Sequence, residues 1–138
     1  MKRNASLVLV ELLIMLAVFA VAAALCIDAF VWADGNSKES AAEDQALLQA
    51  QNAAEVLKHC HGDFSQAAQA LAGEADEKIW QIFYDNDWNV TTGDPAYVLK
   101  VAQISCETAY LGQAKLTVTD RKGAILAELS LGWQEVTP

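Results

Sequence analysis

Apolar residues fill the chain from Leu7 to Ile27, and the only charge among them is Glu11. A helix of this length extends about 30 Å, which matches the hydrocarbon thickness of a bilayer. Trp32 follows shortly after, where aromatic residues typically meet the membrane surface. The pattern therefore predicts a transmembrane helix over residues 7–33.

After this segment the pattern becomes that of an amphipathic helix. Asp34-Gly35-Asn36-Ser37 is a polar, glycine-containing break, and Ser37 is a candidate N-cap for a new helix. A second short helix is predicted over 64–72, with Asp63 as its N-cap. We expect helical structure over 37–72, as one long helix or one hinged at the break. Residues three and four apart predict its buried stripe: Leu47, Ala50, Ala54, Leu57 and His61.

The second half of the chain, over residues 78–136, has the period of β-strands. Branched and aromatic residues predict three or four antiparallel strands. The segments are 78–83, 97–104, 115–119 and 124–133, with Ile125, Ala127, Leu129 and Leu131 on one face of the last. Asp120-Arg121-Lys122-Gly123 is a hairpin connection, and Leu111-Gly112-Gln113 is expected to turn the preceding pair.

The order of these elements predicts an α+β fold. A long N-terminal helix, membrane-spanning in its first half and amphipathic in its second, packs on a small antiparallel β-meander. The head formed in this way covers residues 34–138.

Composition narrows the class of protein. A chain of 138 residues with 54% hydrophobic content holds one membrane segment and about one domain, which excludes a multidomain enzyme. Sixteen acidic and seven basic residues follow Asp28, and this excess of negative charge argues against nucleic acid as a partner. Lys2 and Arg3 precede the apolar run, so the N-terminus is expected in the cytoplasm and the head outside.

Glu11 is the candidate functional residue of the apolar run. Placing an ionised carboxylate inside a membrane costs several kcal/mol on most scales, so such an acid usually has a functional partner. The alternative is that Glu11 snorkels to the nearby interface.

The basic leader Met1-Lys2-Arg3-Asn4-Ala5-Ser6 and the following Leu7-Val8-Leu9-Val10-Glu11 resemble the N-terminal segment of type IV pilins and type II secretion pseudopilins. That family has a small residue, a cleavage point, a hydrophobic first mature residue and glutamate as the fifth mature residue. The resemblance implies a leader over residues 1–6, cleavage between Ser6 and Leu7, and methylation of the Leu7 amine. Ser6 stands where the family usually has glycine. The family's helix-loosening proline is absent, since Asp28 falls near its place, so an uninterrupted helix is expected.

The same resemblance implies a structural role. The chain would be a subunit of a type IV pilus-like or type II secretion pseudopilus filament, single-pass in the cytoplasmic membrane, with an extracytoplasmic head and Glu11 as the assembly residue. Its partners would be a prepilin peptidase, membrane lipid before assembly, an assembly platform, and similar subunits bound through the N-terminal helix. No cofactor is implied. The sequence also contains no recognisable catalytic pair or phosphate-binding loop, so we expect no enzyme.

Other interpretations of the apolar segment stay open. Ala22-Ala23-Ala24 resembles the cleavage site of a secretory signal peptide. Lipidation at Cys26 is disfavoured by the bulky Leu25 before it. A plain signal anchor would make the protein a monomeric extracytoplasmic binding module that is not polymerised.

The head offers weaker candidates for chemistry. Cys60 and Cys106 either form a disulfide, worth roughly 4 kcal/mol on the chain-entropy model, or remain as two buried thiols. Residues 59 and 61 of His59-Cys60-His61 point to different helix faces, which disfavours zinc. Asp85, Asp87 and Asn89 begin like a calcium loop but lack its glycine and its final acid, which favours a plain turn. The aromatic residues are expected in core or edge packing: Trp80, Phe83, Tyr84, Trp88 and Trp133.

Overall fold

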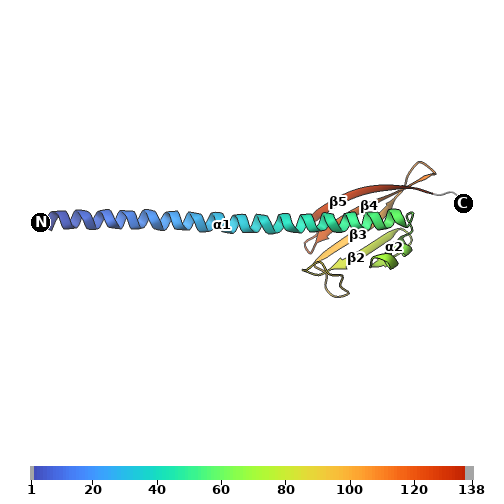
Figure 1. Ribbon diagram of the computed structural model, residues 1–138, viewed down its shortest axis with the longest axis horizontal. Coiled ribbons are helices and arrows are strands. Elements are labelled where there is room, and N and C mark those ends of the chain that lie inside the picture. Colours follow the sequence, from blue (N-terminus) through green and yellow to red (C-terminus); the bar gives the residue numbers. More distant parts are fainter. Residues whose placement is uncertain (1, 136–138) are drawn as a thin grey trace. The chain divides into compact units, whose positions relative to one another are not determined.

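A computed structural model describes residues 2–135 of the chain, and the ends outside this range include the last residue of the predicted 78–136 segment. The chain divides into two compact units, Met1–Ser40 and Ala41–Pro138, which we describe separately. Helix α1 spans Lys2–His59 and helix α2 spans Phe64–Ala70 (Figure 1). The strands are β1 (Glu74–Ala75), β2 (Ile79–Tyr84), β3 (Tyr97–Ile104), β4 (Leu111–Asp120) and β5 (Ile125–Gln134).

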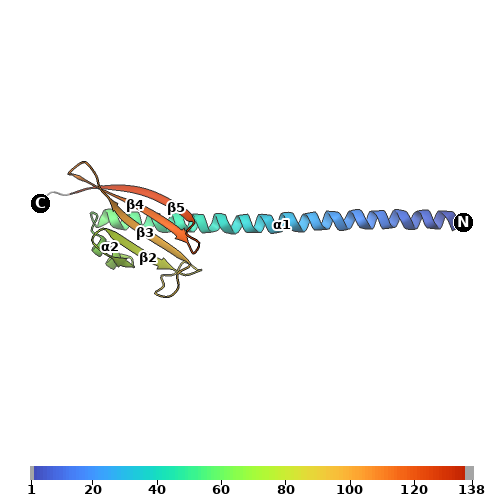
Figure 2. The same cartoon turned by 180° about the vertical axis from the view of Figure 1, so that it is seen from behind.

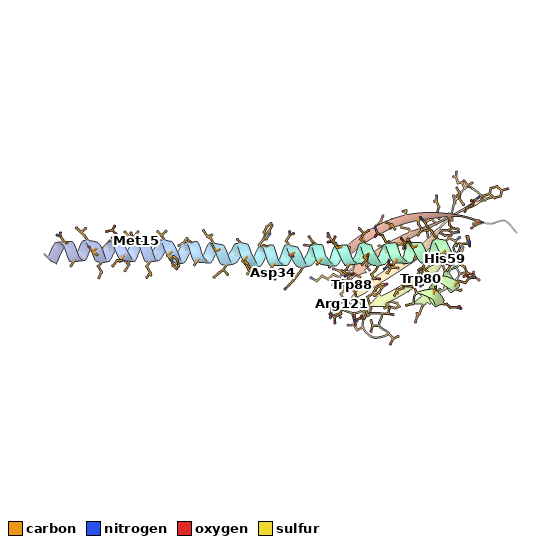
Figure 3. All side chains as sticks on the ribbon, in the orientation of Figure 1. Met15, Asp34, His59, Trp80, Trp88 and Arg121 are labelled. Carbon is orange, nitrogen blue, oxygen red and sulfur yellow. The ribbon has the colours of Figure 1, made fainter. Side chains whose placement is uncertain are left out.

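The N-terminal unit consists of α1 alone. Side chains project from all sides of this part of the helix (Figure 3), and residues 4–40 are all exposed. Within the described residues, one helix is long and apolar enough to cross a membrane, and it is α1.

Of the two alternatives for Asp34–Ser37, the single long helix is confirmed and the hinge is wrong, because α1 continues through these residues without interruption. Ser37 is therefore inside the helix and caps nothing. Gly35 costs a helix only about 1 kcal/mol, and each further residue of an existing helix adds a hydrogen bond without a new nucleation step. The Asp34 carboxylate also pairs with Lys38 Nζ at 3.1 Å, one turn away. The uninterrupted helix expected from the missing proline is confirmed.

The head is an antiparallel meander with strand order β1-β2-β3-β4-β5. The α+β class, with a long N-terminal helix packed on a small antiparallel sheet, is confirmed. The turn predicted at Leu111-Gly112-Gln113 is wrong: these residues open β4, and the connection is residues 105–110. Gly112 pairs across the sheet with Trp133 of β5. The absence of a side chain at Gly112 therefore leaves room for the Trp133 ring and is not needed for a turn.

The last part of α1 lies across one face of the sheet, as Figures 1 and 2 show from opposite sides. An alanine-rich stripe of this helix packs on the sheet. Its buried members are Ala46, Ala50, Ala53, Ala54 and Leu57. Small side chains let the helix backbone come close to the strands, where larger ones would hold it away. The predicted stripe was wrong at both ends. Leu47 is 40% exposed because it lies beside the buried stripe, and His61 follows the end of the helix with a positive φ of 52°.

Alternate residues of the strands complete the core beneath α1. The buried hydrophobic side chains of the strands are Trp80, Ile82, Tyr84, Leu99, Val101, Ala114, Leu116, Val118, Ala127, Leu131 and Trp133. Ile125 was predicted on this face but is 60% exposed. The register between β4 and β5 shifts at Val118/Thr119, and such an irregularity turns the residues beyond it to the other face.

The end of α1 is joined closely to the sheet. Gly62 has a φ of +82°, and its backbone lies against the Trp133 ring, which also covers Gly112. Asp63 then caps α2, its Oδ1 accepting from the Gln66 N–H at 3.1 Å. The predicted second helix and its cap are confirmed, with Ala70 as the last residue.

Candidate functional site: the apolar helix and Glu11

Glu11 lies near the beginning of the apolar part of α1. It is four residues after Leu7, and at 1.5 Å per residue this places it about 6 Å along the helix from the first apolar residue. Ser6, Leu7 and Glu11 are all exposed on the helix. The predicted cleavage point and the predicted assembly residue are therefore accessible from outside the helix.

No residue within one helical turn of Glu11 carries a positive charge. The residues three and four positions away on either side are Leu7, Val8, Ile14 and Met15, and these are the positions from which a helical side chain reaches its neighbours. A cation that offsets the cost of placing this carboxylate in lipid must therefore come from another segment or another molecule.

Asp28 marks the other end of the apolar segment. It lies 17 residues after Glu11, a distance of about 26 Å along the helix. With a hydrocarbon layer of about 30 Å, both acids cannot lie far inside it. Trp32 and the Asp34–Lys38 pair follow Asp28. A bilayer around the apolar run would therefore have Asp28 at its interface and Glu11 within its hydrocarbon layer.

The apolar segment also has a surface suited to another helix. Small and branched residues lie along one side of this segment: Ala17, Val18, Val21, Ala22 and Leu25. Small side chains permit close approach of helices in lipid, where packing contacts and not the hydrophobic effect drive association.

The cysteine prediction is not decided. Cys60 and Cys106 are both free and half-buried, Cys60 at the end of α1 and Cys106 in the connection between β3 and β4. Cys106 lines a polar hollow of about 280 Å³ that also includes Lys78 and Glu135. The disulfide stays a prediction, which the intact mass of the protein under non-reducing conditions would test.

The predicted turn after β2 is confirmed. One Asp85 carboxylate oxygen, Oδ1, accepts the Asp87 N–H and the Asn89 N–H, both at 2.9 Å. Trp88 inside the turn has a φ of +64° and stacks on Tyr97, with ring centroids 4.0 Å apart. Among residues 2–135, no three histidine, cysteine or acidic side chains are grouped as metal ligands.

The large aromatic residues serve packing, as predicted. Trp80, Tyr84 and Trp133 are buried, while Phe83 and Trp88 are half-buried. The Trp80 indole donates to the Ala72 carbonyl at 2.8 Å. Burial raises the pKa of Tyr84 from its ordinary value of 10.0 to about 12, and its hydroxyl donates to Gln49 Oε1 at 3.4 Å.

Comparison of the chain with protein family models, with curated proteins and with solved structures finds no match. The functional argument therefore depends on the chain's own residues. One surface that the sequence analysis missed is the face of β2 and β3 opposite α1, where exposed and half-buried apolar residues surround Lys100. Phe83 at one end of this face lies beside the loop of residues 90–95. The sequence did contain a signal for this surface. The segments 79–83 and 98–104 have apolar residues on both faces of the strand, whereas a strand with one solvated face has them on only one.

Proposed function

We propose that this protein is a structural subunit of a type IV pilus-like or type II secretion pseudopilus filament. Residues 7–33 anchor it in the cytoplasmic membrane with the N-terminus inside, and residues 34–138 form an extracytoplasmic head. The observation that carries the proposal is the position of Glu11, the only charge in the run from Leu7 to Ile27 and the fifth residue counted from Leu7. The helix-and-meander fold of the head is compatible with this class of subunit.

Assembly begins with removal of the leader in this proposal. Cleavage after Ser6 gives Leu7 a free, positively charged amine at the start of the apolar helix. Glu11 of an incoming subunit then pairs with the Leu7 amine of a subunit already in the filament. The pair offsets two charges that would otherwise each be costly in a low-dielectric layer, and it sets the axial register of the helices.

The pairing is energetically large enough to decide assembly. Removing one member of a buried ion pair leaves the other uncompensated, at a cost of about 3–5 kcal/mol. A loss of this size lowers an association constant by at least about a hundredfold, since 1.4 kcal/mol corresponds to a factor of ten. The rest of the apolar surface faces lipid before assembly and the helices of other subunits afterwards.

The decisive experiment compares Glu11→Val with Asp28→Val in the full-length protein in its own membranes. We expect Glu11→Val to abolish filaments and chemically cross-linked multimers, while membrane insertion and the near-UV circular dichroism of the head stay unchanged. Asp28→Val, which removes an acid from the interface end, is the matched control and should retain multimers.

Equal multimer yields in the wild type and in Glu11→Val would refute the assembly role and favour a monomeric, signal-anchored binding module. Intact mass and N-terminal sequence test the first step independently. A chain that starts at Leu7, with or without an added methyl group, fits the proposal, and one that starts at Met1 contradicts processing.

A further inference from the structure

The face of the sheet opposite α1 has two different halves. Over the middle of β4 and β5 it is polar, with Gln113, Lys115, Thr117, Glu128 and Ser130 directed away from the core. Two apolar residues, Leu111 and Ile125, are exposed at the ends of this half, 44% and 60% respectively. The Lys115 ammonium pairs there with the Glu128 carboxylate at 2.9 Å. The polar middle of this half is adequately solvated and needs no partner.

Over β2 and β3 the same face is apolar around a single lysine. Its outward residues are Ile79, Gln81 and Phe83 of β2, and Val98, Lys100, Ala102 and Ile104 of β3. Ile79 is 40% exposed and Ile104 is 39% exposed. We call these seven residues the β2–β3 face. A contiguous apolar area on an otherwise solvated sheet is a typical feature of an interaction surface.

Lys100 lies in the middle of the β2–β3 face, between Val98 and Ala102 along its strand and opposite Gln81. It is exposed, and it takes part in none of the ion pairs formed among residues 2–135. Glu74 at the edge of the sheet offsets its charge, so the whole outer face is neutral. Residues 41–138 include 14 acidic and six basic residues in total, so a neutral face is less negative than the average for this unit.

The complementary surface lies on α1 within the same head. Asp44, Leu48, Gln51 and Glu55 recur three and four residues apart on the side opposite Ala50 and Leu57, and all four are exposed. We call them the α1 stripe. Leu48 is 48% exposed, and the two acids lie on either side of it. This is an apolar centre with negative ends, whereas the β2–β3 face is an apolar surface with a positive centre.

We propose that the β2–β3 face of one subunit binds the α1 stripe of the next copy of this chain. The two surfaces are on opposite sides of the two-layer head, since α1 covers one face of the sheet and the β2–β3 face belongs to the other. A contact between two different surfaces of identical copies is heterologous, and it can repeat without closing. Lys100 meets an acid of the stripe, and Leu48 packs on the branched residues around it. The contact rests on the proposed filament function and adds the head-to-head interface to it.

Mixed-isotope cross-linking of the full-length wild-type protein in lipid vesicles tests the contact directly. Labelled and unlabelled copies are mixed and treated with a carbodiimide, which condenses a lysine amine with a carboxylate, and mass spectrometry identifies the joined peptides. We expect mixed-label links from Lys100 to Asp44 or Glu55. Mixed-label links in which Lys100 joins only other acids, or none, overturn the contact.

Charge reversal provides the second measurement. Lys100→Glu should lower the population of dimers and larger species in sedimentation velocity by about tenfold, since an attractive pair becomes a repulsive one. Lys122→Glu, at an exposed hairpin lysine, is the matched control and should have no effect. Adding Glu55→Lys and Asp44→Lys to Lys100→Glu should restore the multimers. Equal losses from Lys100→Glu and Lys122→Glu overturn the contact.

The outcomes separate this contact from the filament proposal. Multimers that depend on Glu11 and not on Lys100 leave the filament standing and overturn the head contact. A wild-type protein that forms no multimers overturns both.

Discussion

The contact between Trp133 and two glycines gives the sharpest stability prediction. A Cβ added at Gly62 or at Gly112 would overlap the same three ring atoms of Trp133, namely Cε2, Nε1 and Cζ2. Gly112→Ala should therefore cost about 1–3 kcal/mol by overpacking. Gly62→Ala adds the strain of a left-handed backbone, which is roughly 1–2 kcal/mol, so it should be the more damaging change.

Substitutions at two other glycines separate the effect of overlap with Trp133 from the effect of backbone strain. Gly123 has a φ of +81°, and a Cβ added there would meet no heavy atom within 4 Å, so Gly123→Ala measures the backbone strain alone. Gly35 lies within α1 with equally open surroundings, and Gly35→Ala should stabilise the helix by about 0.5–1 kcal/mol. We thus expect Gly35→Ala to be more stable than the wild type. Gly112→Ala and Gly123→Ala should be less stable than the wild type, and Gly62→Ala should be the least stable of all.

Urea unfolding of the full-length protein in detergent, followed by tryptophan fluorescence, measures these differences. With a slope of about 1–3 kcal/mol per molar urea, a loss of about 2 kcal/mol moves the midpoint by about 1 M. Gly112→Ala should cost little in a Trp133→Leu background, because the overlapping ring is gone. The packing argument is refuted if Gly112→Ala costs the same in both backgrounds.

Three further predictions concern the head. Because Tyr84 has a pKa of about 12 in the folded protein against an ordinary 10.0, the stability that depends on its neutral form is complete below pH 10 and declines up to about pH 12. Urea midpoints of the wild type should thus fall more steeply than those of Tyr84→Phe across that interval. Ala50→Leu, at a fully buried position of the stripe, should destabilise by about 1–3 kcal/mol, whereas Gln45→Leu on the exposed side should be nearly neutral by thermal unfolding. Lys115→Met should change the unfolding free energy by less than about 1 kcal/mol at low salt, because its pair with Glu128 is exposed, and a larger loss would contradict that estimate.

Local pattern was enough to predict much of this protein. The apolar run from Leu7 to Ile27 and the position of Glu11 are properties of the chain itself, and they need no tertiary contact. The strand Tyr97–Ile104 was predicted with its observed bounds, because branched residues alternate through it and turn residues flank it. Asp63 was predicted as a cap because aspartate is favoured immediately before a helix, and its bond to the Gln66 N–H confirms this.

Tertiary structure decided the features that depend on distant residues. Gly112 carries the local signal of a turn, yet it belongs to a strand because Trp133, 21 residues later, occupies the space above it. Ile125 matches the apolar alternation of β5, but a register shift against β4 turns it outward. Local sequence records which conformations a residue permits. Packing between distant segments decides which of these conformations is adopted. The same packing places α1 on one face of the sheet and leaves the β2–β3 face on the other.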